Sequence, residues 1–171
     1  EVADLMARFE PLVKHFNRYL TIGGFPELAL SDDDLYAQRM LREDVVDKVI
    51  KRDVLTLFKV RSPLLMEKLF LYLCMNSTEI FSATTAAKEL DNISPNTIES
   101  YVDALVKSNL IYMAYPIAVG SKSVLKGRPK IYIADAAIRN AVLMVDDVLS
   151  DERELGLLIE TTVYKHLVSF Y

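Results

Sequence analysis

The chain has 171 residues, a hydrophobic fraction of 51%, and 24 acidic against 20 basic side chains, which gives a formal net charge of −4. This composition is typical of an ordered globular protein and excludes a disordered tail. No apolar run reaches the roughly 20 residues of a membrane-spanning helix, and the net acidity argues against general affinity for nucleic acid. The single cysteine, Cys74, excludes an internal disulfide and is typical of a reduced, cytoplasmic protein.

Two long helices are predicted in the first third of the chain. Apolar residues spaced by three and four predict a helix over residues 2–20, with Pro11 as a candidate break. The segment GGFPE at residues 23–27 ends this helix, because two glycines and a proline do not continue it. A second apolar face predicts a helix over residues 34–58. We therefore expect residues 1–60 to form a helical connector.

Residues 61–134 carry the pattern of a winged helix-turn-helix. Helix starts and stops are placed at Ser62 with Pro63, Ser82, Ser94 with Pro95, and Asn109. Residues 110–115 and 130–134 are rich in Ile and Tyr, as strands are, and a basic loop separates them. The order of helices, strand, basic loop and strand predicts a winged helix with a β-hairpin wing.

Further helices are predicted after the hairpin, over residues 135–171. Asp135 caps a helix that runs to about Met144, an acidic stretch follows, and a last helix covers about residues 152–170. The expected fold class is therefore mainly α (α+β). An apolar run without a stop signal reaches Tyr171, and the chain starts at Glu1 instead of Met, so we expect a fragment of a longer protein.

The third helix of the winged unit and the basic loop supply the candidate nucleic-acid contacts. These residues are Asn96, Thr97, Ser100, Lys107, Lys122, Lys126, Arg128 and Lys130. Glu99 and Asp103 on the same helix disfavour a polyanion at close range. The loop is either a wing that grips phosphates or a solvated hairpin loop. A salt-dependent contact that ignores base sequence is favoured over specific base recognition.

Catalytic chemistry has few candidates in this sequence. His15 and His166 have no partner at metal-ligand spacing, Cys74 has no evident base beside it, and no GxxxxGK[ST] loop is present. Glu160 has two interpretations. It is either a surface residue or a metal-binding carboxylate whose partner acids lie beyond Tyr171.

Several motifs occur in an order that resembles a known family. They are YLTIGGFPE, VIKRDV, the segment FSATTAAKELDNISPNTIESYVDALVKSNLIY, KIYIADAAIRNAVL and GLLIETTVYKHL. Together they resemble the C-terminal portion of the bacterial and archaeal AAA-type P-loop ATPases that carry a C-terminal domain of unknown function. The resemblance implies an upstream ATPase domain that uses ATP and Mg²⁺, then this region, then a restriction-endonuclease-like fold.

The same resemblance gives meanings to individual residues. Residues 24–27 match the turn that leaves the ATPase lid, and Arg52 with Asp53 matches a recurrent pair. Glu160 matches the acid on the first helix of the nuclease-like fold, so residues 135–171 would be the opening helices of that domain in truncated form. The fold's later acid pair and lysine would lie downstream.

Three functions follow as hypotheses. The leading one is an accessory region of an ATPase that couples nucleotide state to a protein or nucleic-acid partner through the winged helix. The alternatives are a stand-alone winged-helix DNA-binding regulator and a nuclease fragment that relies on Glu160. No cofactor is expected in this chain itself and no membrane is expected as a partner. The sequence leaves the oligomeric state open.

Overall fold

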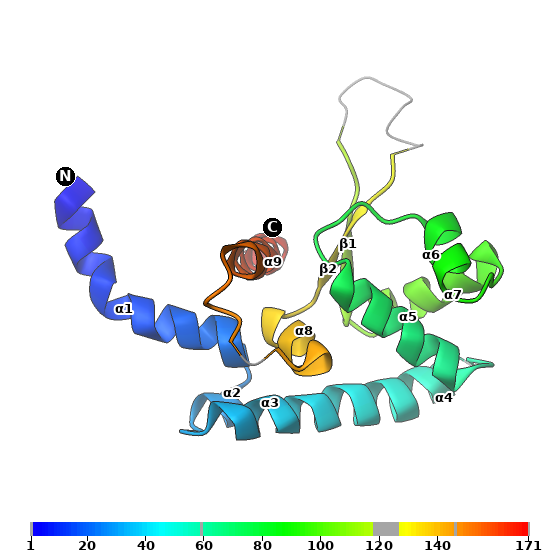
Figure 1. Cartoon of the computed structure of the whole chain (residues 1–171), viewed down its shortest axis with the longest axis horizontal. Helices are drawn as coiled ribbons and strands as arrows, with labels where there is room; N and C mark the ends of the chain where they lie inside the picture. Colours follow the sequence, from blue (N-terminus) through cyan, green and yellow to red (C-terminus); the bar gives the residue numbers. More distant parts are fainter. Residues whose placement is uncertain (1, 59, 118–126, 146, 171) are drawn as a thin grey trace.

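The computed structural model of the chain describes residues 2–58, 60–117, 127–145 and 147–170. It is mainly α-helical with one antiparallel β-hairpin, which confirms the expected fold class (Figure 1). The elements are α1 (Val2–Ile22), α2 (Pro26–Ala29), α3 (Asp34–Arg42), the π-helix η1 (Glu43–Val54), α4 (Leu55–Leu57), α5 (Pro63–Met75), α6 (Ala83–Glu89), α7 (Pro95–Lys107), β1 (Ile111–Ala114), β2 (Lys130–Ile133), α8 (Ala136–Leu143) and α9 (Glu152–Phe170). None of the helices in the described part of the chain is both long and apolar enough to cross a membrane.

α1 continues through Pro11 and ends at the GGFPE turn. The helix bends along its length in Figure 1 without ending, as a proline inside a helix allows. Gly23 ends it with a φ of +77°, and its N–H donates to the Tyr19 carbonyl at 2.9 Å. Glycine adopts this left-handed conformation at little cost, so the predicted turn forms where the sequence placed it.

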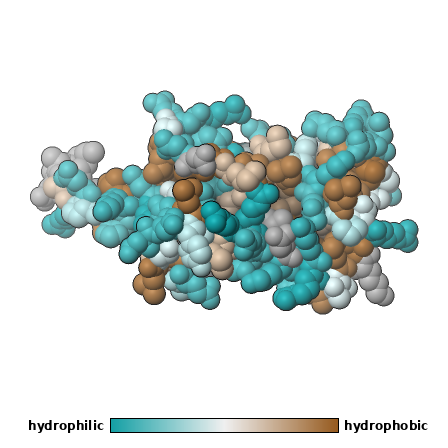
Figure 2. All heavy atoms as spheres, turned by 60° about the horizontal axis from the view of Figure 1, so that its bottom comes forward, coloured by the Kyte–Doolittle hydropathy of each residue, from teal (hydrophilic) through white to brown (hydrophobic). Residues whose placement is uncertain are grey.

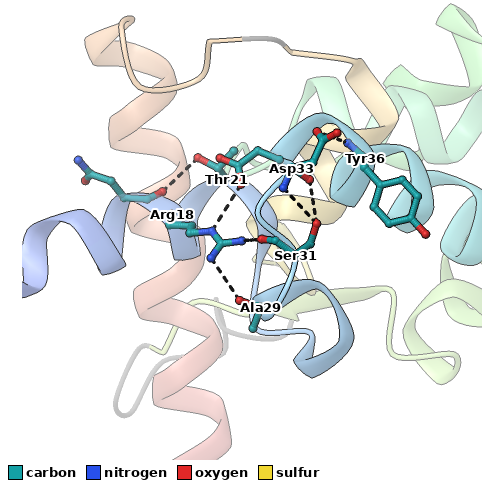
Figure 3. A network of polar contacts seen from close by, with 8 residues as sticks. Arg18, Thr21, Ala29, Ser31, Asp33 and Tyr36 are labelled. Atoms are coloured by element: carbon teal, nitrogen blue, oxygen red, sulfur yellow. Dashed lines mark hydrogen bonds and ion pairs between the residues drawn. The ribbon is translucent and has the colours of Figure 1, made fainter.

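Arg18 ties the end of α1 to the chain that follows the turn (Figure 3). Its guanidinium donates to the carbonyl oxygens of Ala29, at 3.2 Å, and Ser31, and its Nε lies 3.4 Å from Asp34 Oδ1. Asp33 caps α3 by accepting from a backbone N–H of its first turn. One side chain therefore satisfies two loop carbonyls and fixes how α1 meets α3.

The predicted helix over residues 34–58 is continuous, but its middle is wider than an α-helix. η1 follows the π-helical pattern, and the N–H of Leu55 donates to the carbonyl of Ile50, five residues earlier. Ile50 and Val54 are both fully buried. The wider turn keeps these apolar residues on the inner face, and π-helical turns of this kind are rare. Figure 2 shows hydrophobic side chains interspersed with hydrophilic ones on the face that carries this helix.

Local capping rules explain most helix starts in the unit from α5 to β2. The hydroxyls of Ser62 and Ser82 accept backbone N–H groups at 3.3 Å, as predicted for N-caps. The predicted cap at Ser94 is wrong in its chemistry: Ser94 stands at the N-cap of α7, but its side chain makes no cap hydrogen bond. The Thr97 N–H, which a capping hydroxyl would accept, donates to the Ser94 carbonyl at 2.9 Å. Asn109 follows α7 with a φ of +54°, as predicted for a helix stop.

The hairpin has one paired edge and one open edge. β1 and β2 are antiparallel, with Met113 opposite Ile131. On the far side of β2, Ile131 exchanges hydrogen bonds with Thr78 and Glu79, at 2.7 and 3.1 Å. Within the described chain, β1 has no strand on its outer side. β2 is therefore the inner strand and β1 the edge strand.

In the described chain, α9 contributes Leu158 to a small separate cluster, and a larger hydrophobic core joins elements of every predicted segment. Its buried residues include Leu41 from α3, Phe70 from α5 and Ile138 from α8, so all three predicted segments contribute to it. α8 lies between the long helix and the hairpin (Figure 1). The side chain of Asn140 in α8 donates to the Leu20 carbonyl at 3.0 Å. The domain boundaries predicted after residues 60 and 134 stay a prediction.

Candidate functional site

α7 exposes the face that the sequence predicted. Ile98, Val102 and Leu105 are buried, and the Tyr101 hydroxyl accepts the Ser62 N–H at 3.0 Å, so the opposite side of the helix faces solvent. Asn96, Ser100 and Lys107 are exposed there, and Thr97 is half-buried. The structure therefore brings the four candidate residues of this helix to the surface.

The exposed face of α7 is not basic. Lys107 Nζ lies 2.6 Å from Asp103 Oδ2, so the only predicted phosphate contact on this helix with a positive charge is already paired. Glu99 is exposed and pairs with no residue that the structure describes. The helix thus presents one uncompensated negative charge, which weakens its attraction for phosphates.

The structure describes only part of the basic loop. Lys122 and Lys126 lie outside the described residues. Arg128 is described and exposed. Lys130 is the first residue of β2, within the strand predicted over residues 130–134, and its Nζ lies 2.9 Å from Glu160 Oε1. The strand alternation turns Lys130 toward α9, away from the wing.

Glu160 is held by the hairpin. It accepts hydrogen bonds from Lys130 and from the Tyr132 hydroxyl, the latter at 2.8 Å. The Tyr132 ring stacks on Tyr164 with centroids 4.0 Å apart, and the Tyr112 ring, on the paired strand, lies tilted to Tyr164 with centroids 6.3 Å apart. Glu160, through its ion pair and hydrogen bond, and Tyr164, through its ring contacts, therefore join α9 to the sheet.

The protonation of this cluster follows from its contacts. The hydrogen bond from Lys130 holds the pKa of Glu160 below its ordinary value. Burial, followed by the bond to Glu160, raises the pKa of Tyr132 to about 12. Within the described residues, no group of three or more His, Cys, Asp or Glu side chains is placed to hold a metal ion. The metal-binding interpretation of Glu160 stays a prediction.

A second cluster, which the sequence did not predict, lies under the GGFPE turn. Asp135 is buried, caps α8, and pairs with Lys165 at 2.5 Å. Lys165 also donates to the Tyr19 hydroxyl at 3.3 Å, and that hydroxyl lies 3.2 Å from His166 Nε2. Burial would lower the pKa of Lys165, but the hydrogen bond and the charge of Asp135 raise it. His166 is exposed, as is His15.

A buried arginine links α8 to α5 and α9. The Arg139 side chain is only 4% exposed, and it forms two hydrogen bonds to Glu154, the shorter at 2.6 Å. Its Nε donates to the Cys74 carbonyl at 3.0 Å. Burial raises the pKa of the Cys74 thiol, which keeps it neutral and unreactive, as expected for a core cysteine. No spacing in the sequence points to either of these clusters.

A groove of about 780 Å³ opens between α7 and the hairpin. Its lining comes from the start of α6, from α7, from β1, from the residues before β2 and from α9: Phe81, Ser82, Ala83, Thr84, Glu99, Val102, Asp103, Val106, Tyr112, Met113, Tyr115, Gly127, Arg128, Pro129, Tyr164 and Val168. Aromatic and aliphatic side chains predominate, and the three charged groups are Glu99, Asp103 and Arg128. This groove is the strongest candidate binding site in the described part of the chain.

The described fold is thus a mainly α protein in which a helical layer carries a three-helix unit with a β-hairpin. Residues 13–149 match the family described as Domain of unknown function (DUF8612), and the chain belongs to this family. It is 25% identical to the uncharacterized protein MJ1544 of Methanocaldococcus jannaschii over 160 residues, which are 91% of this chain and 34% of that protein. It is 30% identical to the uncharacterized protein MJ1637 of the same organism over 162 residues, 93% of this chain and 33% of that protein. The chain spans about a third of the length of these relatives. No solved structure matches it.

Proposed function

We propose that this chain is the accessory region of a cytoplasmic AAA-type ATP-binding protein, and that its unit from α5 to β2 docks a partner. ATP and Mg²⁺ would be used by an ATPase domain elsewhere in the same protein. The chain's own contribution is a rigid surface, because the hairpin, α7 and the connector share one core. The observation that carries the docking role is the groove beside the open strand β1.

Two further observations support the proposal that this chain is part of a larger ATP-binding protein. The motifs that carry the family resemblance lie where one element of this fold ends and the next begins. The GGFPE turn ends α1, and the KIYIAD segment forms β2 and the cap of α8. The relatives are about three times as long as the matched region, which leaves room for an ATPase domain in proteins of this kind.

ATP binding by the full-length protein tests this proposal. We expect the full-length protein to bind and hydrolyse ATP in the presence of Mg²⁺, with loss of hydrolysis when the lysine of its P-loop is replaced by alanine. Deletion of the region described here should leave ATP binding intact and remove any change in hydrolysis that a partner causes. A full-length protein that binds no ATP would overturn the ATPase assignment.

A nucleic-acid partner is the second candidate, favoured by the exposed Asn96 and Ser100 of α7 and by the exposed Arg128. The observable is the mobility of a duplex oligonucleotide mixed with this chain at low salt. A nucleic-acid reader should retard the duplex, less so as salt rises, and Lys122→Glu with Arg128→Glu should abolish the shift. No retardation at low salt would remove this candidate.

A further inference from the structure

We infer that the groove between α7 and the hairpin binds an extended segment of a partner protein, which adds a strand to the open edge of β1 and places a basic side chain against α7. This deepens the docking role and rests on it. The partner is defined by its chemistry: an unfolded or loop segment with alternating apolar side chains and a lysine or arginine. Three independent features of the groove support this assignment.

The first feature is the direction of the backbone groups of β1. In an antiparallel pair, successive residues of a strand point their N–H and C=O groups alternately toward the partner strand and away from it. The N–H of Ala134 donates to the carbonyl of Leu110, so even-numbered residues of β1 face β2. Ile131, opposite Met113, uses its own groups on the far side of β2. The N–H and C=O of Met113 therefore point to the open edge.

The second feature is the apolar surface beside that edge. Val102 is buried, Val106 and Met113 are half-buried, and all three line the groove. Tyr115, which follows β1, is 60% exposed and lies on the same groove. An added strand would send alternate side chains onto this surface, which is how strand addition gains specificity as well as affinity.

The third feature is the placement of charge. Glu99 stands on the α7 wall without a partner among the described residues, and Asp103 beside it is paired with Lys107. Arg128 stands on the hairpin wall. A basic side chain of the ligand would complement Glu99, and a ligand carboxylate would complement Arg128. A polyanion would meet Arg128 favourably but be repelled by Glu99, so the groove favours a peptide over a nucleic acid.

The test selects short random peptides, displayed as a library, on the folded wild-type chain. We expect the selected peptides to alternate apolar residues and to carry a lysine or arginine. Their affinity should fall about tenfold or more in Glu99→Lys, because an attraction becomes a repulsion. Glu89→Lys, the same change at an exposed site on α6 outside the groove lining, should leave the affinity unchanged.

A second variant addresses the backbone contact. Met113→Pro removes an N–H that the hairpin does not use, and proline is tolerated at such edge positions. It should also weaken binding about tenfold, and in the wild type the Met113 amide should exchange its hydrogen more slowly once peptide is bound. Far-ultraviolet circular dichroism checks that the variant folds, and Glu99→Lys carries the test if it does not.

Four outcomes would overturn the inference. The first three are the absence of any selected peptide, equal binding by Glu99→Lys and the wild type, and retardation of an oligonucleotide that Glu99→Lys strengthens. The fourth is self-association of the chain that Met113→Pro abolishes, because the occupant would then be a second copy. A negative result here leaves ATP binding by the full-length protein untouched, and loss of the ATPase assignment leaves the peptide result standing.

Discussion

Lys130 Nζ and Glu160 Oε1 lie 2.9 Å apart and form an ion pair between β2 and α9. The sequence made Lys130 a candidate nucleic-acid contact and left Glu160 as either a surface residue or a metal-binding carboxylate. In the folded protein the two residues pair with each other. Both charges are about half-exposed and each compensates the other, while the phosphate contact of Lys130 and the metal-binding role of Glu160 stay predictions.

The charge of Glu160 should contribute a small, pH-dependent stabilisation. Its pKa is lowered in the folded protein, so this contribution is present above the ordinary value of 4.5 and is lost as the pH falls through the lowered pKa. Glu160→Gln should therefore lower the free energy of unfolding by less than about 1 kcal/mol at pH 7, given the exposure of the pair. Urea unfolding from pH 7 to pH 3 would show the difference between wild type and variant closing. Glu99→Gln is the matched control, and a difference independent of pH would contradict this explanation.

Gly23 should resist replacement although it lies at a turn. Its φ is +77°, and an added Cβ would lie 2.7 Å from Asp135 Oδ1 and 2.9 Å from the Ala137 Cβ. Gly23→Ala should therefore destabilise the protein by about 2 kcal/mol or more. Gly156→Ala is the control: Gly156 lies within α9 with nothing near its Cβ position, and alanine there should stabilise by about 0.5–1 kcal/mol. Chemical denaturation of both variants measures the contrast, and equal effects would refute it.

The Arg139–Glu154 pair, in which the arginine is buried and the glutamate half-buried, should matter far more than a surface pair. Glu154→Gln leaves the guanidinium of Arg139, 4% exposed, without its counter-charge, and we expect a loss of about 3 kcal/mol. Asp103→Asn breaks the exposed pair with Lys107 and should cost less than about 1 kcal/mol. Denaturant midpoints of the two variants decide between these magnitudes. Similar losses would mean that the burial of Arg139 does not set the cost.

The thiol of Cys74 should be inert in the folded protein. The side chain is fully buried and burial raises its pKa. A reagent therefore cannot reach the sulfur, and the thiol does not ionise to the reactive thiolate at neutral pH. A thiol-specific aromatic disulfide reagent should react with Cys74 only at the rate of unfolding, and fully once denaturant is added. Rapid reaction of the native protein would place Cys74 near the surface and contradict its position in the core.

Local chemistry explains what could be predicted. Ser62, Ser82 and Asp135 cap their helices and Asn109 takes the left-handed conformation because each effect depends only on residues a few positions away. The same holds for the two strands, whose bounds lie within the predicted ranges. Ser94 was predicted by the same rule, yet its side chain does not cap α7: the Thr97 N–H, which a capping hydroxyl would accept, donates to the Ser94 carbonyl.

Contacts between distant residues could not be predicted in this way. Lys165 meets Asp135 and Tyr19, and the latter is 146 residues away along the chain. No periodicity encodes such a meeting, because it depends on how α1, α8 and α9 pack together. The open edge of β1 is likewise decided by which segment pairs with the far side of β2.

The sequence by itself determined the fold class, the order of helices and strands, and the exposed face of α7, since propensity, capping and periodicity act over short distances. Only the tertiary structure decided the chemistry of the surface. It paired Lys130 with Glu160 and Lys107 with Asp103, and it left Glu99, Arg128 and the edge of β1 around one groove. The physical reason is that the interactions of a charged side chain depend on which groups lie beside it, and tertiary packing determines those groups.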